Sequence, residues 1–519
     1  MEGNEKRAII AIGITMLLIT VYSYFYLPSH TNQTPKKGTQ QTQVVKTKAQ
    51  TALPGSANAV TTTAAPKQIK EHLVDVDTDY YTISISNKNG AIKRFVLKKY
   101  HLDKKPVTLV ASTGAYNTLE TVFKDKQVEN VEKSAPYTFD KNNIILNKKG
   151  EKKTLTLTKT LNGITIVKRY IFTNSNYAID FSVKVLKDNQ PLKEEFSVYA
   201  GPNLGDLEKS KYSHLGAVAL VKEKKIRKDE KIKPDEDINW IALESKYFCF
   251  AFLPAESNRL VAGYTNLKGK HYIYANLYAP AALDIYGGPK SKEDIAVVDH
   301  KLSKIIRFGM FGFIGKPLLS VLNFLYSIVG NYGVAIIILT FFIRILFYPL
   351  SFKSYKSMKE MSKLQPKLKE LQLKYKGKPD LLNKATMELY KKHKVNPFGG
   401  CLPVIIQIPV FLALYNVLLN AIELRGAPFA LWITDLSTKD PYYILPIIMG
   451  LTMFVQQKLT PSTMDPKQQK IMMFMPLIFT VMFLSFPSGL VIYWTTNNIL
   501  TILQQFIDSK ILQAKEKNV

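Results

Sequence analysis

The sequence predicts an α+β membrane protein: a polytopic α-helical core of five spans with an N-terminal anchor helix, and a large β-sandwich domain outside the membrane. Apolar runs that recur after residue 330 are long enough to cross a bilayer. Between residues 71 and 313, apolar and polar residues instead alternate over short segments, which is typical of strands with one buried face. A formal net charge of +29 accompanies the apolar runs, because many lysines stand beside them. This charge favours an anionic membrane surface over nucleic acid as a partner.

The N-terminal region is predicted to be an anchor followed by a tether. Residues 1–28 hold an apolar run preceded by Lys6 and Arg7, and no good cleavage site follows it. An uncleaved anchor with its N-terminus inside is therefore favoured over a removed signal peptide. Residues 29–70 are rich in Thr, Gln, Ala, Lys and Pro and contain no aromatic or acidic residue. Such a segment buries too little surface to fold, so we expect a flexible tether.

The alternating segments form a predicted domain at residues 71–315. They are Tyr81–Ser86, Ile92–Leu97, Lys153–Thr158, Ile164–Val167, Phe248–Phe252 and Tyr272–Tyr278. Many short strands without helical repeats between them indicate a large β-sandwich. The domain shows no nucleophile-elbow pattern, and Gly315-Lys316 is followed by Pro317 where a phosphate loop needs Ser or Thr. We expect a binding or scaffolding module.

The two cysteines, Cys249 and Cys401, are predicted to lie in different compartments. A disulfide between them is therefore not expected, and no metal-ligand spacing is present. The sequence predicts neither a metal nor a cofactor.

The membrane core is predicted at residues 330–510. Its five spans are 331–350, 403–422, 441–459, 471–486 and 489–507. Residues 352–402 carry thirteen lysines and four acidic residues, which places this segment in the cytoplasm. Residues 423–440 have only two basic residues and fall outside, whereas the basic tail at 511–519 falls inside. The β-domain is then on the outer side of the membrane.

Two helical segments flank the first of these spans. Residues 316–329 place apolar side chains on one helical face after Pro317, and predict an amphipathic helix lying in the interface. Within 352–402, Pro366 can begin a helix and residues 377–380 form a turn. The leucines Leu368, Leu371, Leu382 and Leu389 fall at helical spacing on the two arms. We expect a cytoplasmic helical hairpin whose lysine-coated face lies near anionic lipid or a ribosome.

Arg344 is the first candidate functional residue, because it stands alone within the apolar run at residues 334–348. A charge at such depth costs roughly 2.5–3.5 kcal/mol on insertion scales. Snorkelling is the alternative, since Pro349 is expected to end the helix about 8 Å away. Thr340 and Tyr348 share the helical face of Arg344. Their presence favours a functional polar site over snorkelling alone.

Other polar residues lie at the cytoplasmic ends of the later spans. They include Gln407, Gln456, Asn497, Asn498, Gln504 and Gln505, whereas Asn416 and Asn420 lie on the outer half of their span. Polar groups in hydrocarbon must be satisfied, so this distribution predicts a wet cavity open to the cytoplasm and closed to the outside. Hydrogen bonds between helices are the alternative, and suit Asn416 and Gln456 better than Arg344.

Four strings carry a specific resemblance to a known family. They are Asn396-Pro-Phe-Gly-Gly-Cys-Leu-Pro-Val-Ile-Ile-Gln-Ile-Pro409, Glu423-Leu-Arg-Gly-Ala-Pro-Phe-Ala-Leu-Trp-Ile433, Asp440-Pro-Tyr-Tyr-Ile-Leu-Pro446 and Phe486-Pro-Ser-Gly-Leu-Val-Ile-Tyr493. In this order they resemble the YidC/Oxa/Alb family of membrane protein insertases. With the anchor and the β-domain, the whole chain is similar to the long YidC type of Gram-negative bacteria.

The resemblance implies a bacterial inner-membrane insertase and chaperone, not an enzyme. Its periplasmic domain would be a β-supersandwich similar to sugar-mutarotase domains, and its partners would be nascent membrane proteins and the Sec translocon. The family's hydrophilic groove implies roles for Arg344 and Thr340, and we add Gln407 and Asn498 as groove residues. A tyrosine often contacts substrate in the last span; here Tyr493 is followed by Trp494, which keeps an aromatic surface and loses the hydroxyl.

Two other classes of function fit less well. A transporter or channel would need polar residues across the full membrane thickness, and usually internal repeats. A sugar-acting enzyme would need clustered carboxylates in the β-domain, which the sequence does not locate.

Overall fold

The computed structural model describes residues 70–517, apart from 103–104, 112–113, 203, 205–213, 228, 256–259, 299, 394, 396–401 and 462–471. The predicted anchor, most of the tether, Cys401 and the start of the fourth predicted core span lie outside the described residues. Among these residues, contacts divide the chain into a β-rich unit up to Gly288 and a helical unit from Pro289 onward. Residues 289–315, predicted as the end of the β-domain, group with the helices by these contacts.

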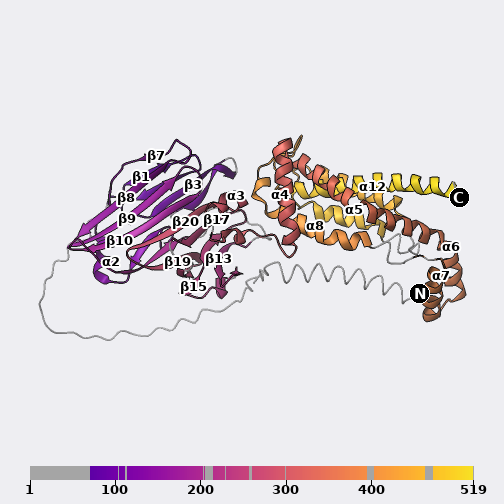
Figure 1. Cartoon of the computed structure of the whole chain (residues 1–519), viewed down its shortest axis with the longest axis horizontal. Helices are drawn as coiled ribbons and strands as arrows, with labels where there is room; N and C mark the ends of the chain where they lie inside the picture. Colours follow the sequence, from indigo (N-terminus) through magenta and orange to yellow (C-terminus); the bar gives the residue numbers. More distant parts are fainter. Residues whose placement is uncertain are drawn as a thin grey trace, which may run out of the picture. The chain divides into compact units, whose positions relative to one another are not determined.

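Three sheets make up the β-rich unit (Figure 1). The first has the order β4-β3-β2-β1-β7, the second has ten strands in the order β14-β13-β16-β17-β20-β10-β9-β8-β6 with β11 beside β10, and the third has the order β15-β18-β19-β12-β5. The first sheet comprises β1 (Leu73–Asp77), β2 (Tyr81–Ser86), β3 (Ile92–Leu102), β4 (Lys105–Ala111) and β7 (Ile144–Ile145). The second comprises β6 (Thr138–Phe139), β8 (Lys152–Leu161), β9 (Ile164–Thr173), β10 (Ala178–Lys187), β11 (Gln190–Pro191), β13 (Gly216–Val221), β14 (Lys224–Ile226), β16 (Trp240–Glu244), β17 (Phe248–Pro254) and β20 (Ala281–Pro289). The third comprises β5 (Glu120–Phe123), β12 (Glu195–Ala200), β15 (Glu236–Ile238), β18 (Leu260–Leu267) and β19 (Lys270–Tyr278).

The ten-stranded sheet contacts both smaller sheets. Phe95 of β3 lies edge-on to Phe250 of β17, with ring centroids 6.3 Å apart. β13 and β16 pack against β18 and β19 of the third sheet. Every residue of β13, β16 and β17 is buried, as expected of strands covered on both faces. The predicted β-rich domain is confirmed, and all six strand segments predicted from alternation are strands.

A helix that the sequence analysis did not predict, α2 (Lys126–Ser134), packs on this sheet over β8 and β9. Asp125 caps it by accepting hydrogen bonds from the amides of Gln127 and Val128. Glu132 of α2 reaches into the core, where Lys168 Nζ lies 2.9 Å and Lys159 Nζ 3.6 Å from its carboxylate oxygens.

Both lysine side chains of this cluster are completely buried. Tyr137 donates to Glu132 Oε2 over 2.5 Å, and its ring lies 4.2 Å from Lys159 Nζ. Gly90, at φ +61°, leaves room for this arrangement, because a Cβ there would come within 2.9 Å of the Lys168 side chain. We call Glu132, Lys159, Lys168 and Tyr137 the buried lysine cluster.

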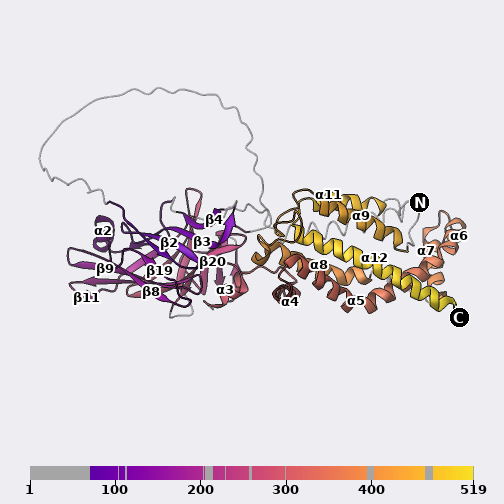
Figure 2. The ribbon, with the colours of Figure 1, turned by 90° about the horizontal axis from the view of Figure 1, so that it is seen from above.

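The helical unit contains the following elements among its described residues. They are α3 (Lys292–Ala296), α4 (Gly312–Val329), α5 (Tyr332–Lys363), α6 (Gln365–Lys374), α7 (Pro379–Lys392), α8 (Leu402–Asn420), α9 (Ile444–Leu459), α11 (Met475–Phe483) and α12 (Ser488–Lys517). Two of these, α4 and α5, are long and apolar enough to cross a membrane by length and composition, and α8 and α9 include shorter apolar stretches. α12 is central: it packs against α5, α8 and α9 (Figure 2).

Three prolines correct the predicted helix limits. α5 was predicted to end at Pro349, but it continues through this proline to Lys363. A proline inside a membrane helix is tolerated when its surroundings satisfy the freed backbone carbonyl. α4 begins at Gly312, so Pro317 lies inside it and not at its start. Pro476, within the predicted span at 471–486, stands in the first turn of α11, where its missing N–H costs nothing.

α4 lies crosswise to α5 and α8 and contacts both (Figure 1). Gly330, in the left-handed conformation, ends α4, and Asn331 caps α5 by accepting from the Val334 amide. The predicted hairpin arms correspond to α6 and α7, which contact each other. Gly377, at φ +82°, lies in the turn between them.

Candidate functional site: polar seams on the central helix

The polar site is assembled on α12, which presents different polar residues to different neighbours. Residues at spacings of three and four share a helical face. Asn497, Thr501 and Asp508 accordingly face α5, whereas Asn498 and Gln505 face the side of α9. We call these two contacts the α5 seam and the α9 seam.

Arg344 joins α5 to α12 in the first seam. Its Nη2 donates to the backbone oxygen of Asn497 over 3.3 Å and also to the hydroxyl of Thr501. Its Nε is buried and has no hydrogen-bond partner among the described residues. The guanidinium is thus held in place through Nη2, which is only part of its donor set.

The same seam continues one turn farther along α5. Tyr348 donates its hydroxyl to Asp508 Oδ1 over 3.0 Å, and Gln504 Nε2 donates to Asp508 Oδ2 over 3.3 Å. Tyr348 was predicted on the Arg344 face, whereas Thr501 and Asp508 were not among the candidate residues. Asp508 could have been found as the lone acidic residue between Asn497 and Lys510, at helical spacing from Asn497.

Thr340 is buried and donates to the Ile336 carbonyl of its own helix over 2.6 Å. It lies on the face of Arg344 without a hydrogen bond to α12. Its hydroxyl is therefore satisfied within α5.

The α9 seam holds another of the predicted groove residues. Asn498 is buried, and its amide donates to Thr452 Oγ1 over 3.2 Å and to the Met449 carbonyl over 3.4 Å. Gln505 donates to Thr460 Oγ1 over 2.9 Å. The structure therefore places Asn498 in a contact separate from that of Arg344.

Gln407 and Tyr493 meet between α8 and α12, where Gln407 Nε2 donates to the Tyr493 hydroxyl over 2.8 Å. Trp494 lies against Phe411 of α8 and Phe483 of α11, with ring centroids 4.8 and 5.4 Å apart. Its indole Nε1 is buried and has no hydrogen-bond partner among the described residues. Trp494 thus belongs to an aromatic cluster and leaves one donor unused.

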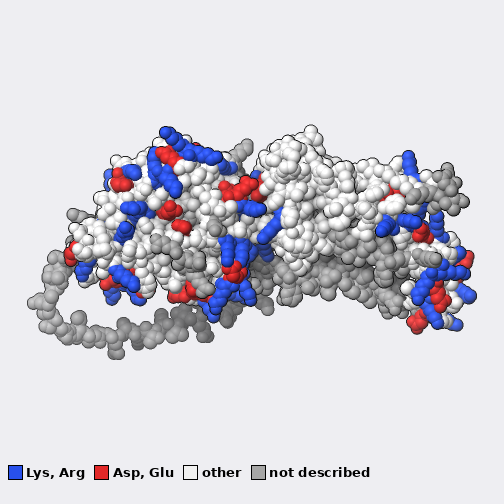
Figure 3. Space-filling model, viewed as in Figure 1, with Lys and Arg blue, Asp and Glu red and all other residues white. Residues whose placement is uncertain are grey.

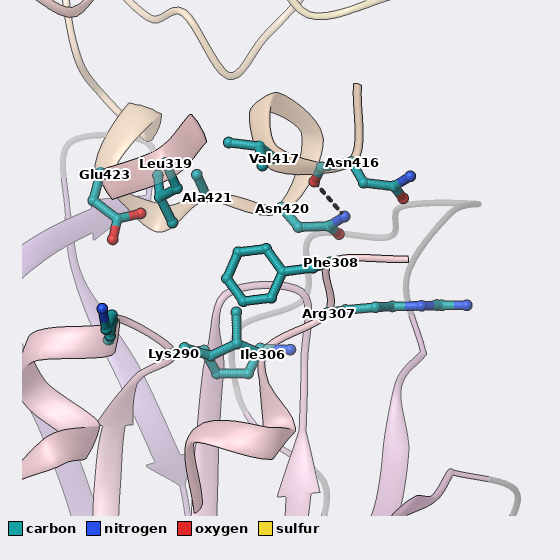
Figure 4. Close-up of a pocket in the computed structure, with 11 residues that line it drawn as sticks. Lys290, Ile306, Arg307, Phe308, Leu319, Asn416, Val417, Asn420, Ala421 and Glu423 are labelled. Atoms are coloured by element: carbon teal, nitrogen blue, oxygen red, sulfur yellow. Dashed lines mark hydrogen bonds between the residues drawn. The ribbon is translucent and has the colours of Figure 1, made fainter. Parts of the chain in front are cut away.

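A separate cavity lies beside the C-terminal end of α8 (Figure 4). It is lined by the connector at Ile306–Phe308, by α4, and by Asn416 and Asn420 of α8. Asn420 donates to the Asn416 carbonyl and Asn416 to the Leu412 carbonyl, so both amides bond to the preceding turn of their own helix. These two asparagines are therefore satisfied away from Arg344.

The loop between α8 and α9 is held by a buried carboxylate. Asp440 accepts from Trp432 Nε1 over 3.0 Å and from the Leu445 amide over 2.7 Å, which caps the start of α9. Ser488, at the start of α12, donates its amide to Thr438 over 2.7 Å. This end of the unit is thus tied down by hydrogen bonds.

Charged side chains avoid part of the helical unit. On the face shown in Figure 3, they gather over the α6 and α7 end, and the surface over α4, α5 and α8 shows almost none. Large apolar side chains such as Phe342, Leu346 and Leu451 are exposed there and on α9. Among the described residues, no group of three or more His, Cys, Asp and Glu could hold a metal ion. The fold and these seams define a helical membrane protein with a β-rich domain and a polar contact inside its helices.

Comparison with known proteins identifies the family. The profile described as the YidC periplasmic domain matches residues 73–321, and the profile described as the 60Kd inner membrane protein matches residues 324–516. The membrane protein insertase YidC of Citrifermentans bemidjiense is 41% identical over 460 residues, covering 84% of this chain and 85% of that protein. That of Geotalea uraniireducens is 40% identical over 538 residues, covering 98% and 100%. The chain belongs to the YidC family of membrane protein insertases.

A crystal structure of an active YidC insertase with its first transmembrane domain resolved is 18% identical, with a TM-score of 0.39, and covers 84% of this chain and 92% of that one. The sequence resemblance is confirmed by the family match. The chain is accordingly an inner-membrane insertase and not an enzyme, and its β-rich unit is the periplasmic domain.

Proposed function

We propose that the chain inserts and folds integral inner-membrane proteins through a hydrophilic groove beside the α5 seam, open to the cytoplasm. The observation that carries this proposal is Arg344, a partly buried cation on an apolar helix, held by Asn497 and Thr501 with its buried Nε unsatisfied. A hydrophilic segment of a nascent protein would enter beside Arg344 while its apolar segment moves along the lipid-facing helices. Thr340, Gln407, Tyr493, Trp494 and Asn498 are proposed to line or support this path.

No nucleotide-binding motif was found in the sequence, and the energetics do not require one. A twenty-residue apolar helix gains roughly 6–12 kcal/mol on entering the bilayer, if each residue contributes about 0.3–0.6 kcal/mol. The membrane potential adds about 2.3 kcal/mol for each negative charge moved outward per 100 mV. The obstacle is the passage of polar residues, and a groove that is wet for half the membrane shortens it.

The proposed topology has five core spans and an N-terminal anchor, with both termini in the cytoplasm. The lysine bias of 352–402 and the gathering of charge at the α6 and α7 end support it. The crosswise placement of α4 supports a helix lying in the interface, although its length would permit a span. Sec translocon components, the ribosome and anionic lipid are the proposed partners, the last two through the basic cytoplasmic loops and tail.

The test is insertion of substrates with charged N-terminal tails by Arg344→Ala and Arg344→Lys variants. Arg344→Ala should lower insertion of acidic-tailed substrates, and Arg344→Lys should retain much of it if positive charge is what matters. Lys458→Ala, which removes an exposed lysine of α9, is the matched control. Full activity of Arg344→Ala on every substrate, at normal protein levels, would remove the electrostatic role.

A further inference from the structure

Asp508 is a buried carboxylate at the cytoplasmic end of the α5 seam. Its exposed fraction is 0%. It stands seven residues beyond Thr501, about 10 Å farther along α12 at 1.5 Å per residue. The seam therefore holds a cation, Arg344, and, closer to the cytoplasm, an anion.

The partners of Asp508 are neutral. Its two oxygens accept from the Tyr348 hydroxyl and from the Gln504 amide. Among the described residues, no lysine or arginine forms an ion pair with it. An asparagine could keep both contacts without the cost of burying a charge, because its oxygen would accept from Tyr348 and its amide would donate to the Gln504 oxygen once that side-chain amide turns over. Hydrogen bonding between α5 and α12 therefore does not by itself explain a carboxylate at this position.

We propose that Asp508 sets the charge selectivity of the groove by offsetting the positive charge of Arg344. This inference rests on the proposed function. Asp508 is buried behind Tyr348, so it acts through its electric field and is a positioning residue, without direct contact with the segment that passes. A segment that enters from the cytoplasm meets this field before it reaches Arg344. The pair of opposite charges then limits how strongly acidic segments are favoured over basic ones.

The direction of the effect follows from Coulomb's law. Without the negative charge the groove becomes more positive, so acidic tails gain and basic tails lose. At about 10 Å in a partly wet site, one charge changes the relative preference by about three- to ten-fold. A purely structural role would instead change the insertion of all tails by the same factor.

The experiment uses the full chain in membrane vesicles and one single-span substrate whose tail carries two acidic, two neutral or two basic residues. The readout is the ratio of acidic-tail to basic-tail insertion, measured within each variant so that protein level cancels. Asp508→Asn should raise this ratio about three- to ten-fold, with Asp508→Ser as a second neutral variant and Asp508→Glu retaining the original ratio. Tyr348→Phe, which removes the hydrogen bond and keeps the charge, should affect all three tails alike.

An unchanged ratio in both neutral variants, or a ratio that Tyr348→Phe alters as much as Asp508→Asn does, would overturn the inference. Arg344→Ala, measured in parallel, separates the two proposals. If it lowers the ratio while the neutral variants of Asp508 do not change it, only the role of Asp508 fails. If it leaves the ratio unchanged, the role of Arg344 fails, and the inference that Asp508 offsets its charge fails with it.

Discussion

Replacing Glu132 with Gln should destabilise the periplasmic domain strongly. Glu132 is the anionic member of the buried lysine cluster, with both lysine side chains fully buried beside it. Gln keeps the volume and removes the negative charge, so two ammonium groups would remain buried without a counter-charge, bonded only to backbone carbonyls and to the new side-chain amide oxygen. Removing one partner of a buried ion pair costs about 3–5 kcal/mol. At about 2–4 °C per kcal/mol for a domain of this size, the melting temperature should fall by about 6–20 °C.

The cluster should also make the stability depend on pH. Burial, the largest cause, lowers the pKa of Lys159 to about 8, although Glu132 opposes the shift. An unfolded lysine keeps its proton up to about pH 10.4, so between about pH 8 and 10 the unfolded state binds more protons. The contribution of Lys159 to stability therefore rises with pH in this window. Lys159→Met should remove that rise, which comparison of the two pH profiles would show.

The assay is thermal unfolding of the full-length protein in nanodiscs, with hydrogen exchange of the β8 and β9 amides to locate the transition. Glu195→Gln is the matched control: it breaks a 2.6 Å ion pair with Lys124, whose side chain is 73% exposed. Exposed pairs of this kind contribute about 0–1 kcal/mol. Equal, small losses of stability for Glu132→Gln and Glu195→Gln would refute the account in which the Glu132 charge stabilises the core. A failure of Lys168→Met to restore stability in the Glu132→Gln background would refute it as well.

Three predictions concern the proposed mechanism. A protease added outside spheroplasts should digest residues 71–313 and spare 352–402, and the reverse pattern would invert the topology. Leu368→Asp or Leu389→Asp should impair insertion more than joint neutralisation of Lys374 and Lys376, because α6 and α7 pack against each other and Leu368 is buried. The opposite ranking in the same insertion assay would show that the hairpin acts through its bulk positive charge. Deletion of about residues 75–300, with the anchor and α4 kept, should leave measurable insertion of a small substrate, since the polar seams all lie in the helical unit. Complete loss of insertion by a stable truncated protein would place the periplasmic domain within the mechanism.

The strands were predictable because alternation is a local signal. β2 coincides with the segment predicted at Tyr81–Ser86. The buried lysines carried the same kind of signal, because Leu155, Leu157 and Lys159 hold successive inward positions along β8. No local pattern, however, shows the carboxylate that pairs with them from α2.

The polar site was predictable only in part, for a related reason. Arg344 stands out because it interrupts an apolar run, whereas its partner Thr501 lies 157 residues away and resembles an ordinary helix residue. Asn498 appeared to join the Arg344 site because it shares its depth, and the structure turns it toward Thr452. Depth can be estimated from sequence position, but the face of α12 that meets each neighbour depends on tertiary packing.

The uninterrupted course of α5 has a geometric consequence for the cytoplasmic hairpin. Its 32 residues extend about 48 Å, compared with a hydrocarbon core of about 30 Å, so the proposed topology leaves several turns as a rigid stalk in water. α6 follows after one residue, Leu364, which ends one helix and begins the next. The stalk therefore sets both the distance of the hairpin from the membrane and its rotation about the α5 axis. Removing seven residues from the stalk would lower the hairpin by about 10 Å and turn it by only about 20°. Removing five would turn it by about 140°, so the hairpin would present a different side to a partner in the cytoplasm.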